Sequence, residues 1–291
     1  MDELGQLIDV NIALDATLTG GDCLPTLPLS NLQIPAGEYL KSPARFVDAT
    51  DLDGTQFEAE LPWAQSINLI ALLFTTLSRT ALFRLTIAGA DGDLDNPIYQ
   101  GEWTPVVPRL WQSSSLDWGA PNWWTGQPLA RDLDLYPRHR WMPLPARTLC
   151  KRLRVELDDR DNPDGWIDIG GLLIGLGWSP WRNFDRGRQR ELIVRSLIEE
   201  TPSGRLITEA RRPRRQQRVT WSMLTAADAD RITDASIRAS DTGVVFFVPD
   251  LGDPASLLRD CFPATIALHP QPTLGFPGLH TATATFREVI A

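Results

Sequence analysis

The fold is decided by residues 151–190, which read KRLRVELDDRDNPDGWIDIGGLLIGLGWSPWRNFDRGRQR. Two short runs in this stretch, 153–157 and 166–169, alternate between apolar and polar residues with a period of two, as half-buried strands do. The turn formers DNPDG at 161–165 lie between the two runs. The pattern therefore predicts two strands joined by a tight connection.

Further strands are predicted on the N-terminal side of this stretch. Residues 55–61 and 82–87 also alternate, and residues 67–74 form an almost continuous apolar run that is typical of a fully buried strand. No long helical periodicity precedes residue 185. Short strands separated by glycine and proline favour a β-sandwich or jelly roll over a parallel α/β sheet.

The segment 99–141 has no clear periodicity and is rich in tryptophan, proline, aspartate and serine. A stretch of this length inside a compact domain is usually a functional loop or an interface. We therefore expect an elaborated insertion that packs some of its own aromatic side chains.

The sequence changes in character after residue 185, where it becomes arginine-rich. Strands are predicted over 191–198 and 218–223. A helix is predicted over about 226–240, because Thr225 has the character of an N-cap and aspartates occupy the first turn. A buried strand at 243–249 and a closing strand at 281–290 complete a predicted α+β unit. The expected domains are thus 1–184 and 185–291.

The stretch 151–190, with the segment Trp178-Ser179-Pro180-Trp181-Arg182-Asn183-Phe184 inside it, resembles minor tail (baseplate) proteins of long-tailed bacteriophages. Residues 67–74, Leu77-Ser78 and 82–86 are similar to the central strand pair of the same family. The resemblance implies an N-terminal galactose-binding-like jelly roll that ends in a hairpin. It also implies a second, smaller β-sandwich-plus-helix domain like those of tail tubes and distal-tail rings.

What the resemblance implies about function is structural. The chain would be made in the host cytoplasm and would belong to the virion, at the tail tip or baseplate. Its partners would be other tail proteins, in a homo-oligomeric ring.

Composition and charge limit the classes of protein to which this chain can belong. The chain has 291 residues, of which 43% are hydrophobic and 22% charged, so a globular protein is expected rather than a disordered one. A net charge of −9 argues against nucleic acid as a partner, because phosphates attract positive surfaces. The start of the chain lacks the pattern of a secretion signal, and no apolar run is long enough for membrane insertion. The three cysteines are expected to be buried free thiols.

The usual motifs of enzymes and metal sites do not occur in the sequence. The three histidines lack a metal-ligand spacing, and His139, between two arginines, is expected to be exposed. The acidic stretch 158–165 lacks the ligand spacing of a calcium loop and is interpreted as a turn with solvated acids. We therefore expect no catalysis, no cofactor and no metal.

A glycoside hydrolase is a weaker alternative, because it needs only two carboxylates beside a sugar cleft. Asp117, Asp132 and Asp134 could supply them. With 37 acidic residues in the chain, such proximity arises easily by chance.

Sugar binding without catalysis, as in a host-attachment protein, is the main alternative function, with a glycan of the host surface as the partner. Aromatic faces stack on the apolar faces of sugars, while polar side chains satisfy the hydroxyl groups. The same side chains would also serve as anchors at a protein interface, which is the interpretation we favour from the sequence. The candidate residues are Trp118, Asn122, Trp123, Trp124, Arg131 and Asp132.

A second candidate surface is an arginine cluster interrupted by Pro213. Guanidinium groups so close together repel one another unless carboxylates approach them, which favours a contact with a neighbouring protein. The predicted interface residues are Arg211, Arg212, Arg214 and Arg215.

Overall fold

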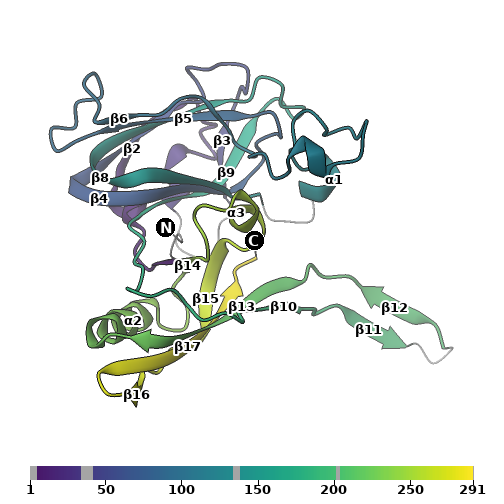
Figure 1. Ribbon diagram of the computed structural model, residues 1–291. Helices are drawn as coiled ribbons and strands as arrows, with labels where there is room; N and C mark the ends of the chain where they lie inside the picture. The colour runs from purple at the N-terminus through teal and green to yellow at the C-terminus, as the bar shows by residue number, and fades with distance from the viewer. Residues whose placement is uncertain (1–4, 34–41, 134–137, 201–203, 291) are drawn as a thin grey trace. The chain divides into compact units, whose positions relative to one another are not determined.

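The computed structural model of the chain describes residues 5–33, 42–133, 138–200 and 204–290 (Figure 1). The protein is mainly β and contains a β-sandwich, as predicted. It divides into two compact units. The sandwich unit contains Val10–Trp178 and Val248–Cys261, and the terminal unit contains the residues up to Asp9, Ser179–Phe247 and Phe262–Ile290.

The sandwich unit is built on one extensively paired sheet. Its order is β3-β9-β4-β8-β5-β6, with β2 also paired to β4 and β7 to β5. The strands are β2 (Thr17–Gly20), β3 (Ala44–Phe46), β4 (Phe57–Thr75), β5 (Leu82–Ala88), β6 (Tyr99–Gln100), β7 (Thr104–Pro105), β8 (Arg140–Asp158) and β9 (Ile167–Gly175).

The two longest strands, β4 and β8, contribute to both layers of the sandwich. Their register shifts between Glu60 and Gln65 and again between Ile67 and Leu69. Before the shifts β4 pairs with β2, and after them it pairs with β9. Such irregularities bend a strand and increase its twist. Both halves of β4, together with β5, β8 and β9, contribute side chains to one buried core.

The two strands predicted around residues 153–157 and 166–169 are present as parts of β8 and β9, but the hairpin between them is wrong. Strand β4 lies between β8 and β9 and pairs with both. The apolar run at 67–74 is the reason, because it needs hydrogen-bonding partners on both sides when it is buried. The short connection between β8 and β9 therefore passes over β4, which comes earlier in the chain.

The terminal unit holds a second sheet and the longest helix. The sheet order is β1-β14-β15-β17-β13-β10, with β16 paired to β17. The strands are β1 (Gln6–Ile8), β10 (Gln189–Ile193), β13 (Arg214–Leu224), β14 (Val245–Val248), β15 (Phe262–Leu268), β16 (Thr273–Phe276) and β17 (Leu279–Glu288).

The predicted helix is α2 (Ala226–Ala239), and the sequence located it well. The Thr225 hydroxyl accepts a hydrogen bond from the backbone N–H of Asp228, and the Asp228 carboxylate accepts one from the backbone N–H of Thr225. This capping box satisfies two of the donors that a helix start leaves open. The buried face of α2 includes Ala229, Ile232 and Ala235.

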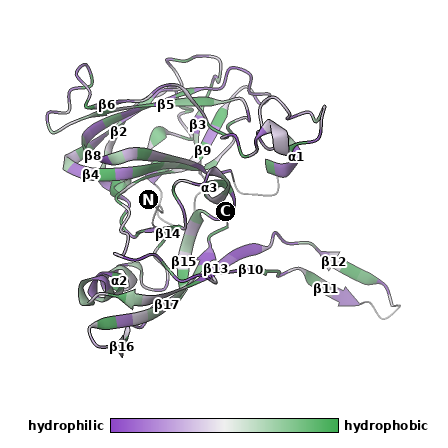
Figure 2. Ribbon diagram, in the orientation of Figure 1, coloured by the Kyte–Doolittle hydropathy of each residue, from purple (hydrophilic) through white to green (hydrophobic). Residues whose placement is uncertain are grey.

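The predicted strand 191–198 is divided between β10 and a separate hairpin. Strands β11 (Leu197–Glu200) and β12 (Leu206–Glu209) pair with one another and with no other described strand. We call residues 194–200 and 204–212 the hairpin arm. Figure 2 shows that hydrophobic residues occur in both of its strands. An isolated two-stranded hairpin is only marginally stable in water, so this arm is an unusual feature.

A division at residue 184 does not separate the two units, because each unit contains segments from both sides of that residue. Helix α3 (Pro254–Arg259), which the sequence did not predict, belongs to the sandwich unit. At the other end of the chain, β1 joins the sheet of the terminal unit. Whether residues 1–184 and 185–291 fold separately stays a prediction.

The three cysteines form no disulfide, and two of them are buried as expected. Cys150 and Cys261 are buried, whereas Cys23 is half-buried. Burial raises the pKa of Cys150 to about 12. Burial, followed by the negative charge of Asp22, raises the pKa of Cys23 to about 11. None of the helices in the described parts of the chain is long and apolar enough to cross a membrane.

One ion pair fastens the start of the chain to α2 within the terminal unit. The carboxylate of Asp9 accepts two hydrogen bonds from Arg231, at 2.9 and 2.6 Å, and one from Arg238 at 2.7 Å. The Asp9 side chain is almost fully buried. Burial on its own would raise the pKa of Asp9, but the hydrogen bonds and charges of the two arginines hold it below the ordinary value.

We expect Asp9→Asn to lower the free energy of unfolding by about 2–4 kcal/mol, because two guanidinium groups lose their carboxylate. Chemical denaturation at pH 7 measures this change. Asp15→Asn is the matched control, since Asp15 is exposed and its substitution should cost less than about 0.5 kcal/mol. In the wild type, the Asp9 contribution is present above its unfolded-state pKa and is lost as the pH falls through the lowered folded-state pKa. Equal stability of the two variants would contradict this account.

Candidate functional site

The most distinctive surface feature of the sandwich unit is a tryptophan-rich loop between β7 and α1 (Ala130–Leu133). We call residues 109–127 the Trp loop. Its backbone is held at Gly126, whose carbonyl accepts hydrogen bonds from the N–H groups of Leu110 and Trp111 at 2.9 and 3.1 Å. The N–H of Gly126 donates to the carbonyl of Asn122 at 2.7 Å. Segments at opposite ends of the loop are thereby fastened together.

Position 126 of the Trp loop requires a glycine. It has φ +61°, in the left-handed region, and a Cβ added there would lie 2.2 Å from the carbonyl oxygen of Trp111. Glycine alone avoids that clash and adopts the left-handed conformation without strain. The close backbone approach therefore depends on the absence of a side chain.

Side chains reinforce the same closure. Arg109 donates from Nε to the Trp111 carbonyl and from Nη2 to the Ser113 hydroxyl, both at 2.9 Å. Ser113 in turn donates to the Trp123 carbonyl at 2.9 Å. This chain of bonds links both ends of the loop through polar groups rather than through an apolar core.

Two amides complete the anchoring. Asn122 is buried and donates from Nδ2 to the Gln127 carbonyl at 2.8 Å. Gln127 donates from Nε2 to the Val107 carbonyl at 2.7 Å, which joins the loop to the segment that follows β7. Asn122 was a candidate for a glycan or interface contact, and its amide Nδ2 donates within the loop, where it supports the backbone.

The tryptophans lie on the outside of this anchored frame. Trp118 and Trp124 are each 85% exposed. Trp123 is half-buried and packs edge-on against Trp118, with ring centroids 5.1 Å apart and an interplanar angle of 69°. Two tryptophans so fully exposed on one loop make this surface a candidate for binding.

Arg131 and Asp132, the two other candidates for a glycan or interface contact, differ in their surroundings. Arg131 is exposed and lies 3.8 Å from a carboxylate oxygen of Asp132. The Asp132 carboxylate also accepts a hydrogen bond from the N–H of Leu129 at 3.2 Å, which caps the short helix α1. Arg131 thus has donors available to a ligand, whereas Asp132 is engaged in the local structure. Of the acids considered for a glycosidase, Asp117 is exposed and Asp134 lies outside the described residues.

The four arginines of the predicted interface differ in burial and in partners. Arg215 is largely buried and forms a two-pronged ion pair with Glu288 of β17, at 3.0 and 2.8 Å. Its guanidinium also lies 4.7 Å from the ring centre of Phe262. Arg215 therefore belongs to the interior of the terminal unit.

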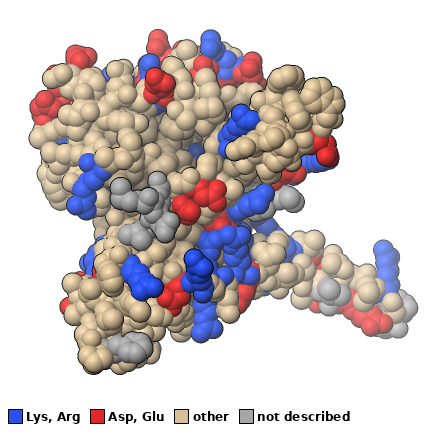
Figure 3. Space-filling view, viewed as in Figure 1, with Lys and Arg blue, Asp and Glu red and all other residues tan. Residues whose placement is uncertain are grey.

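The other three arginines lie nearer the surface. Arg211 pairs with Glu209 at 2.8 Å and is exposed, as is Arg212, while Arg214 is half-buried. Figure 3 shows basic side chains beside acidic ones on the surface of this unit. Arg211 and Arg212 remain candidates for a protein contact.

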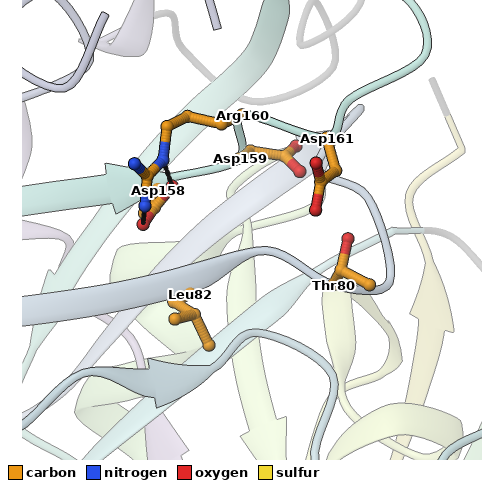
Figure 4. A pocket seen from close by; sticks show the side chains of 6 residues that line it. All are labelled: Thr80, Leu82, Asp158, Asp159, Arg160 and Asp161. Carbon is orange, nitrogen blue, oxygen red and sulfur yellow. Dashed lines mark hydrogen bonds and ion pairs between the residues drawn. The ribbon is translucent and has the colours of Figure 1, made fainter. Parts of the chain in front are cut away.

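The acidic stretch after β8 lines a pocket of about 380 Å³ with Thr80 and Leu82 (Figure 4). The predicted turn is present, but Asp159 is buried rather than solvated. Its carboxylate accepts hydrogen bonds from the N–H and hydroxyl of Ser78 and from Asn162. Burial raises the pKa of Asp159 above its ordinary value, although these hydrogen bonds oppose the rise.

The remaining acids of this pocket do not form a cation site. Asp158 is paired with Arg160 through two bonds of 2.9 Å. Across residues 5–33, 42–133, 138–200 and 204–290, three or more His, Cys, Asp or Glu side chains nowhere form a group that could hold a metal ion. Within this stretch, the Asp159 carboxylate supports the turn through its hydrogen bond from Asn162.

The expectation that His139 is exposed is wrong. The side chain is buried, and its Nδ1 accepts a hydrogen bond from the N–H of Phe74 at 3.2 Å. The neighbouring Arg140 is buried as well, and burial followed by the charge of Arg138 lowers its pKa to about 10. Both residues lie near the start of β8, whose long pairing with β4 brings them inside.

No protein-family model matches the sequence, and no curated protein matches it. Among solved structures, the chain is similar to the family 32 carbohydrate-binding module of C. perfringens NanJ in complex with galactose, with 9% identity, TM-score 0.36, and coverage of 59% of this chain and 98% of that one. It is also similar to the lectin domain of lectinolysin complexed with Lewis B antigen, with 8% identity, TM-score 0.37, and coverage of 57% and 96%. A third is a fucose-binding module of Streptococcus pneumoniae, with 12% identity, TM-score 0.35, and coverage of 57% and 96%.

We expect Gly126→Ala to loosen the Trp loop. Hydrogen exchange at the Leu110 and Trp111 amides should lose at least about tenfold of its protection, because the bonds to the Gly126 carbonyl are displaced. Gly119→Ala is the matched control, since Gly119 also has a positive φ, of +81°, but no atom lies within 4 Å of an added Cβ. Similar protection in both variants would show that the close approach at Gly126 does not hold the loop.

Proposed function

We propose that the sandwich unit is a carbohydrate-binding module without catalytic activity and that it binds sugar at the Trp loop. The observation that carries this proposal is the exposure of Trp118 and Trp124, each 85%, on a loop fixed by its own hydrogen bonds. A pyranose presents a flat apolar face that stacks on an indole ring. Hydrogen bonds already join the backbone of the loop at Gly126, which lowers the cost of fixing that backbone on binding.

Exposed polar groups on the Trp loop and on α1 fit the same ligand class. The Arg131 guanidinium and the Asp117 carboxylate are exposed, and they could donate to and accept from sugar hydroxyls. Sugar binding is favoured over hydrolysis because Asp132, a candidate catalytic acid, is committed to the start of α1. A surface glycan of a host cell is the partner that this role implies.

We expect the purified full chain to bind defined sugars on a glycan array. Trp118→Ala and Trp124→Ala should each weaken binding by about tenfold or more, because stacking on an aromatic ring is lost. Trp63→Ala is the matched control, since Trp63 is an exposed tryptophan of β4 outside the Trp loop. The proposal fails if no sugar binds, or if Trp63→Ala weakens binding as much as the other two substitutions.

A structural role in a phage tail tip or baseplate is the second proposed function, and the hairpin arm favours it. Leu206 and Ile207 of the arm are 63% and 54% exposed, and Val194 and Leu192 are exposed as well. Subunits of assemblies commonly cover such side chains at contacts with a neighbour. Localisation in the virion, contact with other tail proteins and a homo-oligomeric ring are parts of this proposal. It is compatible with sugar binding by the other unit.

For the assembly role, we expect the double substitution Arg211→Glu and Arg212→Glu to leave the chain folded and to prevent its incorporation into particles. Circular dichroism and the protein composition of purified particles measure the two effects. Arg215→Glu should instead destabilise the terminal unit by about 3 kcal/mol or more, because Glu288 would remain buried without its partner. Normal particles containing the double variant would argue against an interface at Arg211 and Arg212.

A further inference from the structure

The hairpin arm has two open edges and exposed aliphatic side chains, and its two strands differ in charge pattern. Strand β11 and the residues before it read Arg195-Ser196-Leu197-Ile198-Glu199-Glu200. This run is positive at its start, aliphatic in its middle and negative at its end. Strand β12 with its flanks, residues 205–211, is positive at both ends.

The charge polarity of β11 makes it complementary to itself in the antiparallel direction. If two copies of β11 lie side by side and antiparallel, with the two-fold axis at Leu197, Leu197 faces its own copy. Arg195 of each copy then faces Glu199 of the other, at a spacing where side chains interact across strands. In the same arrangement of two β12 strands Arg205 would face Glu209, whose carboxylate is already paired with Arg211 at 2.8 Å.

Pairing with a second strand also requires unpaired backbone groups along one edge of β11. Among the described strands, β11 pairs only with β12, so the backbone groups on its outer edge face solvent. Such an edge is a template for a further strand. Arg195, Glu199 and Glu200 are all exposed, so their side chains can reach a partner without disturbing the fold.

We propose that the hairpin arm is a docking surface for a second copy of this chain, in which two β11 strands pair antiparallel to form a four-stranded sheet. The contact has two-fold symmetry and therefore closes at two copies. It is distinct from the contacts of a ring, which run from one subunit to the next, and it does not depend on sugar binding or on a place in a virion.

The test is the association state of the purified full chain, measured by sedimentation and light scattering over a range of concentrations. The wild type should form a dimer. Arg195→Glu alone should weaken dimerisation by about tenfold or more, because glutamates then face each other across the contact. Glu199→Arg alone should weaken it similarly, since Arg195 then meets a second arginine.

Mixing the two variants should restore the dimer, because Glu at position 195 of one chain meets Arg at position 199 of the other, and the native Arg195–Glu199 pair remains on the other side of the axis. Asp93→Arg, an exposed charge reversal in the sandwich unit, controls for net charge and should leave dimerisation unchanged. A monomeric wild type would overturn the proposal, as would a dimer that tolerates both reversals or is not restored by mixing. None of these outcomes bears on sugar binding or on incorporation into particles, so failure here is distinguishable from failure of the proposed functions.

Discussion

The sandwich unit depends on the pairing of β4 along both of its edges. Buried backbone groups must be hydrogen-bonded, and a strand as apolar as residues 67–75 can satisfy its own only between two other strands. Strands β8 and β9 fill these places, and the register shifts in the β4–β8 pair carry both strands from one layer to the other. This arrangement fixes the end of the Trp-rich segment 99–141, because its last two residues already belong to β8.

The sequence predicted the elements that depend on local chemistry. The helix at 226–239 begins where Thr225 and Asp228 cap it, and the apolar run at 67–74 forms part of the central strand. The pairing of strands could not be predicted in the same way. The partner of β9 is set by burial of β4, about 100 residues earlier in the chain, so the short DNPDG connection suggested a hairpin that does not form.

The candidate site was predicted in part. The tryptophans stood out in the sequence as a cluster. The sequence did not reveal that the Asn122 amide bonds within the loop, or that Arg215 is paired with Glu288. Gly126 was missed, although a glycine directly after Trp123-Trp124-Thr125 is the signal that could have identified it. Its importance appears only when the Trp111 carbonyl is seen to approach it, because that contact joins residues 15 positions apart.

The central claim is that the Trp loop is a rigid platform before any ligand arrives. Backbone ¹⁵N relaxation of the full chain without ligand tests this claim most directly, through the order parameters of Trp118 and Trp124. The hydrogen bonds around Gly126 predict values of about 0.8, close to those of the strands. Values below about 0.6 for these two residues would contradict the account, because the aromatic rings would then belong to a flexible segment.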